Sequence, residues 1–201
     1  MRRRAEVSLL FLSISCASRA PPTPAALDVA ADEHLAQKLF ARGVQIYKCQ
    51  AIASDPTRGA WTFVAPEAEL FATPEGSAAI GHHSAGPTWQ LDDGSRVTGR
   101  VRVKAKAPDG SGVDWLLLDA EGASGPSFAG VNILRRVDTV GGKAPDASSA
   151  PCTLGETRRV EYRATYELFV RREITERDRR SRSSISNGLM DAGRIPQNLW
   201  F

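Results

Sequence analysis

The sequence predicts an all-β fold: a single antiparallel β-barrel or β-sandwich of about seven to eight strands, with one short N-terminal helix. Short segments in which apolar and polar residues alternate recur along the chain, turn residues separate them, and few stretches have helical periodicity. A chain of 201 residues suits one domain with its termini. Periodicity does not distinguish a barrel from a sandwich, so both remain open.

Residues 1–17 have the organisation of a signal peptide. Three arginines follow Met1, and the apolar run 7–14 is too short to cross a bilayer as a helix. Cleavage after Ala17 would release an exported protein, so we expect the periplasm, the cell envelope or the extracellular space. The alternative is a lipoprotein with Cys16 as the lipidated residue and the lipid as its only membrane contact, although Ser13 stands where such signals prefer leucine.

Three further segments are expected after the signal. Residues 18–40 form a tether and a short helix, the tether because prolines at 21, 22 and 24 block regular structure and the helix over 32–40. Residues 41–170 form the β domain. Residues 171–201 are rich in arginine and serine and lack a period, so we expect disorder, with a shifted reading frame as an alternative origin.

The β domain contains its strands in order between turn signals that carry glycine, proline or aspartate. In the first strand, alternation places Val44 and Ile46 on one face, and Gln45, Tyr47 and Cys49 on the other. Residues 114–119 form a continuous apolar run between two aspartates, which predicts a central strand. The expected strands are 44–50, 61–64, 68–71, 96–106, 114–119, 131–137 and 159–170.

The clearest alternation lies in residues 96–106. A charged face at period two is typical of a half-solvated antiparallel strand, so we interpret its basic residues as a water-exposed face rather than an anion site. The pattern places Val97, Val101, Val103 and Ala105 inward, and Arg96, Thr98, Arg100, Arg102, Lys104 and Lys106 outward.

The net charge of +3 resides at the two ends of the chain. Residues 1–20 and 171–201 each carry +3, which leaves −3 on residues 21–170. A mildly acidic domain does not suit a nucleic-acid partner, and we expect none.

Two cysteines, Cys49 and Cys152, lie at opposite ends of the β domain. In an oxidising compartment we expect them to form a disulfide. The cysteines lack zinc-site spacing, and no GxGxxG motif follows a strand. We therefore expect no metal and no cofactor.

The densest group of polar and aromatic residues lies between Gly81 and Ser95. Neighbouring residues of a strand point to opposite faces, so the two adjacent histidines are not expected to serve one site. We interpret the segment as a candidate ligand site for a small molecule or glycan in a binding or interaction module. The competing interpretation is structural: a bend, a core tryptophan and a hairpin turn. The candidate residues are His82, His83, Trp89, Asp92, Asp93 and Ser95.

A secreted enzyme is the alternative to a binding module. His82 or His83 would act with Asp92 or Asp93, by a hydrolytic or metal-assisted reaction. No Gly-x-Ser-x-Gly motif supports a serine nucleophile, and we assign no catalytic residue.

Several of these segments also resemble a known family. They are Val44-Gln-Ile-Tyr-Lys-Cys-Gln50, Trp61-Thr-Phe-Val-Ala-Pro-Glu-Ala68, Gly81-His-His-Ser-Ala-Gly-Pro-Thr-Trp89 and Asp93-Gly-Ser95. The chain is similar, over roughly residues 40–170, to exported bacterial and fungal proteins that share a domain of unknown function. The resemblance implies a secreted, β-rich domain and carries no established activity.

Overall fold

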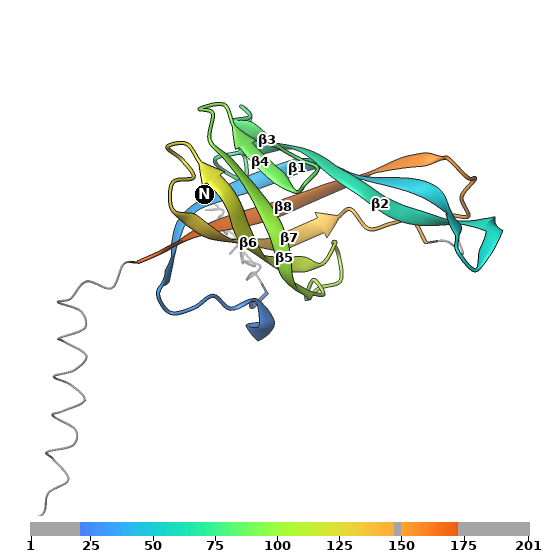
Figure 1. Cartoon of the computed structure of the whole chain (residues 1–201), viewed down its shortest axis with the longest axis horizontal. Helices are drawn as coiled ribbons and strands as arrows, with labels where there is room; N and C mark the ends of the chain where they lie inside the picture. Colours follow the sequence, from blue (N-terminus) through green and yellow to red (C-terminus); the bar gives the residue numbers. More distant parts are fainter. Residues whose placement is uncertain (1–20, 147–149, 173–201) are drawn as a thin grey trace, which may run out of the picture.

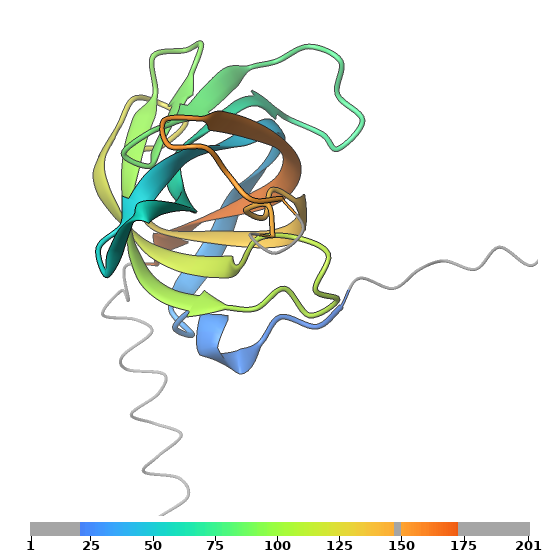
Figure 2. The same ribbon diagram turned by 90° about the vertical axis from the view of Figure 1, so that its right-hand side faces the viewer.

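The computed structural model describes residues 21–146 and 150–172. The expected signal peptide, with Cys16, and the expected tail beyond residue 172 lie outside the described residues. The described chain forms eight antiparallel strands, each paired with the next, and the last pairs with the first to close the sheet into a barrel (Figures 1 and 2). The strands are β1 (Glu33–Ile52), β2 (Asp55–Phe71), β3 (Gly81–Ser84), β4 (Thr88–Leu91), β5 (Arg96–Ala105), β6 (Trp115–Ser124), β7 (Val131–Gly141) and β8 (Thr157–Arg171).

The all-β, antiparallel prediction is confirmed, and the closed ring selects the barrel. The short helix expected at residues 32–40 is wrong, because this segment is the first part of β1. Its backbone pairs with the end of β8, from Glu33 opposite Arg171 onward, and tertiary pairing outweighs a weak helical preference. Among the described residues the only helical turn is η1 (Ala25–Leu27), and no helix there is long and apolar enough to span a membrane.

The barrel interior is filled by side chains from alternate positions of the strands. Trp89 is 1% exposed and lies at the centre of this cluster, where its ring meets Tyr166 edge to face at 5.0 Å. The interior cluster includes Leu39, Leu70, Trp89, Val97, Leu118, Leu134, Tyr166 and Leu168.

A second apolar cluster covers part of the outside of the barrel. The segment around η1 passes along β5 and β6 and places Leu27 against their outer face (Figure 1). Both faces of β6 are therefore buried: Leu116 and Leu118 belong to the interior cluster, whereas Trp115 and Leu117 belong to the outer one. This explains why residues 115–118, in the run predicted as a central strand, are all apolar.

The faces predicted for residues 96–106 are wrong beyond Val101, because β5 contains a β-bulge there. The register shifts between Val101 and Val103, so Val103 pairs opposite Leu117 of the outer cluster and Lys104 pairs opposite Leu116 of the interior. One extra residue in a strand exchanges the faces of everything that follows. Val97 points inward as predicted, but Val103 and Ala105 pack outside, and Lys104 and Lys106 line an internal cavity.

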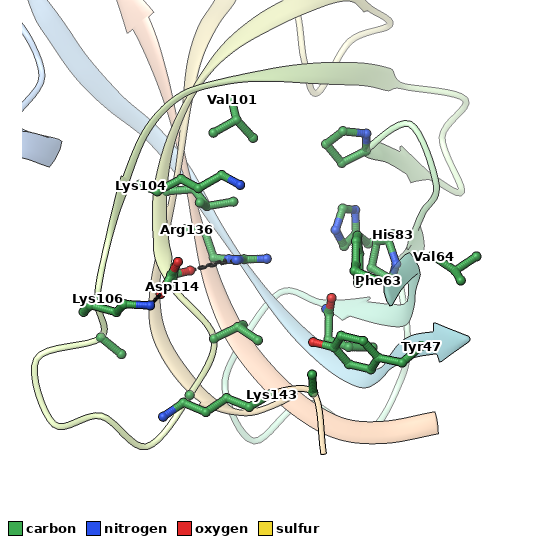
Figure 3. Close-up of a pocket in the computed structure, with 18 of the residues that line it drawn as sticks. Tyr47, Phe63, Val64, His83, Val101, Lys104, Lys106, Asp114, Arg136 and Lys143 are labelled. Atoms are coloured by element: carbon green, nitrogen blue, oxygen red, sulfur yellow. Dashed lines mark hydrogen bonds and ion pairs between the residues drawn. The ribbon is translucent and has the colours of Figure 1, made fainter. Parts of the chain in front are cut away.

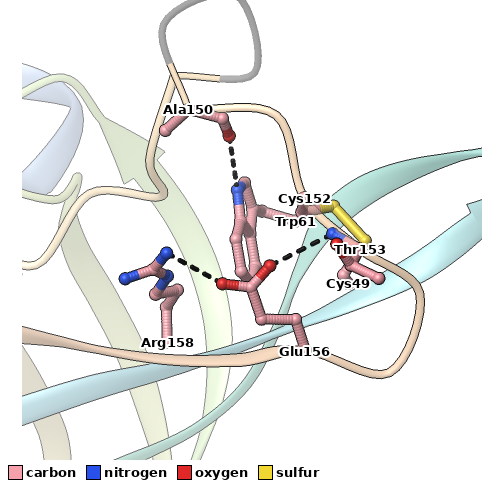
Figure 4. The surroundings of a disulfide bond; sticks show 7 residues. All are labelled: Cys49, Trp61, Ala150, Cys152, Thr153, Glu156 and Arg158. Carbon is pink, nitrogen blue, oxygen red and sulfur yellow. Dashed lines mark hydrogen bonds and ion pairs between the residues drawn. A yellow bond between two sulfur atoms is a disulfide. The ribbon is translucent and has the colours of Figure 1, made fainter.

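The predicted disulfide between Cys49 and Cys152 is confirmed, with a Cα–Cα distance of 5.8 Å (Figure 4). It joins the β1–β2 hairpin, which projects beyond the short strands β3 and β4 in Figure 1, to the connection between β7 and β8. Trp61 supports the same junction by donating a hydrogen bond from Nε1 to the Ala150 carbonyl at 3.1 Å. The disulfide thereby fixes the outer part of the hairpin, beyond the Tyr47–Phe63 pair that borders the cavity.

Candidate functional site

A cavity of about 570 Å³ lies inside the barrel, at the base of the projecting hairpin (Figure 3). Its walls come from β1, β2, β3, β5, β6 and β7, and from the connections at residues 85–87, 106–114 and 143–144. Six of the eight strands thus contribute to one site.

Exposed apolar side chains line this cavity, Phe63 and Val64 from β2 on one side and Val101 from β5 near Lys104 (Figure 3). Phe63, Val64 and Val101 are 50%, 52% and 37% exposed, and they are three of the six large hydrophobic residues that the described chain leaves exposed. A bulge brings the first two together: Tyr47 pairs with Phe63 and Ile46 with the residue at 65, so Val64 has no partner across the ladder. The Tyr47 and Phe63 rings meet edge to face at 5.8 Å.

Basic side chains line the side of the cavity that faces Phe63, where Figure 3 shows Lys104, Lys106 and Arg136. Lys106 forms an ion pair with Asp114 at 3.2 Å. Arg136 donates from Nε and Nη2 to the backbone carbonyl of Asp114, at 3.1 and 2.7 Å. With Lys143, four basic side chains and one carboxylate line a cavity in a domain whose net charge is −3.

Two buried polar side chains, Gln45 and His83, contribute to the cavity wall, each 2% exposed. Nδ1 of His83 donates to the Thr88 carbonyl at 2.8 Å, which leaves Nε2 as an acceptor. The imidazole stacks on Trp89 at 4.4 Å. Burial lowers the pKa of His83 to about 3, so the ring is neutral at physiological pH.

Gln45 is one of several residues with a buried polar atom that forms no hydrogen bond with the described residues. Its Nε2, and the hydroxyls of Tyr162 and Tyr166, have no hydrogen-bond partner among the described residues. Burial raises the pKa of Tyr162 far above its usual value. Tyr47, by contrast, donates from its hydroxyl to the Gly142 carbonyl at 2.6 Å, which ties the chain after β7 to the cavity wall.

The neutral imidazole predicts a pH-dependent stability. The unfolded chain takes up a proton on His83 below pH 6.5, whereas the folded chain does so only near pH 3, so stability present at pH 7 is lost as the pH falls. Between pH 7 and pH 5 this histidine should reduce the free energy of unfolding by about 2 kcal/mol. Urea denaturation at both pH values measures the loss, and His83→Phe should remove most of it.

His82 supplies the control for this experiment because its side chain is exposed on the other face of β3. His82→Phe should leave the loss between pH 7 and pH 5 nearly intact. An equal loss in the His83→Phe protein would contradict the assignment to His83.

The six residues proposed from the sequence do not form one site. His82 and His83 lie on opposite faces of their strand, as expected, and only His83 lines the cavity. Trp89 is a core residue beneath the imidazole. Asp92 is exposed in the turn between β4 and β5 and has no contact with His83.

Asp93 and Ser95 build that turn. Asp93 accepts hydrogen bonds from the Ser95 amide at 2.8 Å and from the Ser127 hydroxyl at 2.5 Å, and these bonds lower its pKa. Ser95 is buried, and its hydroxyl accepts from the Ser127 amide at 2.9 Å. The structure therefore provides no aspartate beside His83, and no three His, Cys, Asp or Glu side chains of the described residues gather as a metal site.

The sequence analysis missed Phe63, Val64, Lys104 and Arg136 as site residues. Alternation placed Lys104 on the outer face because it contains no signal for a bulge. The exposed apolar pair at 63 and 64 resembled an ordinary strand. A signal was present in the concentration of basic residues at 100–106 of an otherwise acidic domain.

Comparison with protein families finds one matching family model, described as a protein of unknown function (DUF3455), over residues 30–170. The match begins just before β1 and ends in β8, so it covers the complete barrel. Searches of curated proteins and of solved structures found no match.

Proposed function

The chain belongs to the DUF3455 family of proteins of unknown function, and we propose that it is an exported binding module whose barrel holds a small molecule with an apolar body. The observation that carries this proposal is the gathering of Phe63, Val64 and Val101, all exposed, in a cavity of about 570 Å³. Small-molecule sites in proteins usually enclose roughly 300–1,000 Å³ with mainly apolar walls.

The energetics favour a bound apolar group. Covering a side chain such as Phe63 removes apolar surface from water, which contributes about 1.5–3 kcal/mol when burial is complete. The closed ladder of strands fixes the cavity walls in advance, so little ordering opposes binding.

The buried position of Trp89 favours a small molecule over a glycan. Sugars bind by stacking on exposed aromatic faces, but Trp89 is covered by His83 on one side and is enclosed in the core. The disulfide supports export, because such bonds persist in oxidising compartments.

Binding of the uncharged fluorophore N-phenyl-1-naphthylamine tests the proposal. We expect a saturable rise in fluorescence with one site per chain, and roughly tenfold weaker binding by Phe63→Ala, because the ligand loses a large apolar contact. Leu35→Ala is the matched control, since Leu35 is comparably exposed but lies outside the cavity. Absence of saturable binding, or equal weakening by both variants, would refute the proposed function.

A further inference from the structure

Two cations of the basic cavity wall, Lys104 and Arg136, have no carboxylate partner among the residues that the structure describes. We propose that the natural ligand is an organic anion, an apolar body bearing a carboxylate or a similar group, whose charge is held by Lys104 and Arg136. This inference rests on the proposed binding function and adds the chemical class of the ligand.

Strand register places the two cations on one inner row. Lys104 of β5 pairs opposite Leu116 of β6, and Leu116 pairs opposite Arg136 of β7. Directly opposed residues share a face, so all three point into the barrel. Neighbouring strands lie about 4.8 Å apart, which puts the two cationic residues roughly 10 Å apart at the backbone, with their long side chains on either side of Leu116.

Lys104 has no hydrogen bond or ion pair with any described residue, although it lies on the interior face. The bulge in β5 turns this exposed lysine toward the cavity, where water or a bound anion can reach its ammonium group.

Arg136 is oriented but not neutralised. Nε and Nη2 donate to a carbonyl, that of Asp114, and not to a carboxylate. These two bonds fix the plane of the guanidinium and leave other N–H groups available, which is the arrangement that binds carboxylates well. The carboxylate of Asp114 is itself paired with Lys106.

Two cations on the outer face of the same strands, Arg100 and Arg135, do have carboxylate partners. Arg100 pairs with both Asp119 and Glu121. Arg135, next to Arg136 on β7, pairs with Glu167 at 2.7 Å. Carboxylates thus accompany Arg100 and Arg135 on the outer face, whereas Lys104 and Arg136 have no carboxylate partner among the described residues.

The occupant that fits is therefore an anion with an apolar body. Its charged group would accept hydrogen bonds from Lys104 and Arg136, and its body would cover Phe63 on the opposite side and Val101 near Lys104 (Figure 3). Charge-assisted hydrogen bonds of this kind are about twice as strong as neutral ones.

The test compares 2-naphthoate with 2-naphthamide by isothermal titration calorimetry at neutral pH and low salt. The two probes share one ring system and differ in charge. We expect the carboxylate to bind at least about tenfold more tightly, and the difference to shrink as added salt screens the cations. Equal affinities would overturn the anion assignment and leave the proposed function intact, whereas binding of neither probe, nor of N-phenyl-1-naphthylamine, would overturn both.

Variants at Lys104 test whether this residue causes the preference for naphthoate over naphthamide. Lys104→Met should weaken naphthoate about tenfold and leave naphthamide unchanged, and Lys104→Arg should restore the preference. Lys48→Met is the matched control, because Lys48 is an exposed lysine on β1 outside the cavity. The same loss from Lys48→Met would show a general charge effect and overturn the inference. Melting temperatures confirm that each variant is folded.

Discussion

Removal of the Cys49–Cys152 disulfide should lower the free energy of unfolding by about 3–5 kcal/mol. The bond spans 103 residues, so its loss releases a large loop in the unfolded chain, and the chain-entropy model gives about 4–5 kcal/mol for such a loop. Urea denaturation of the Cys49→Ser/Cys152→Ser protein measures the effect. Reduced wild-type protein is the control and should have the same stability as the double variant.

Backbone hydrogen bonds at the junction should hold part of it in place when the disulfide is removed. The Cys49 amide donates to the Glu156 carbonyl at 2.8 Å, and the Gly155 amide donates to the Cys49 carbonyl at 3.0 Å. Gly59 lies so near that a Cβ there would meet Cys49 Sγ at 2.3 Å, so a larger residue at 59 is incompatible with the closed bond. A double variant as stable as the oxidised protein would show that the disulfide does not restrain the unfolded chain.

Trp89→Ala should destabilise the barrel by about 3–5 kcal/mol, because it leaves a large void at the centre of the interior cluster. The indole contacts His83 on one face and Tyr166 at its edge, and both contacts are lost. Thermal and urea denaturation measure the change.

Trp89→Phe is the informative control. Its ring can still stack on His83, and no hydrogen bond is lost, because Nε1 of Trp89 has no partner among the described residues. We expect a clearly smaller loss than for alanine. Similar losses in the two variants would mean that the indole is not a packing element of the core.

Much of the barrel could be predicted from the sequence because its signals are local. Alternation of side chains reports the strand period directly, and it located the strands that later paired as β1, β2 and β5–β8. It also placed Gln45, Tyr47 and Cys49 on one face, which the structure shows to be the buried one. The disulfide followed from the positions of two cysteines.

The candidate site was less predictable, because it depends on single-residue shifts of register. A bulge between Val101 and Val103 turns Lys104 inward, and another at Val64 brings two apolar residues to the cavity. Neither bulge interrupts the pattern of residue types along the chain.

The sequence by itself determined the fold class, the approximate strands, the disulfide and the family. Only the tertiary structure decided that residues 33–40 extend β1, that the sheet closes, and that Lys104 and Arg136 meet Phe63 across one cavity. The physical reason is that periodicity is a property of each strand, whereas closure and register depend on hydrogen bonds between strands far apart in the chain.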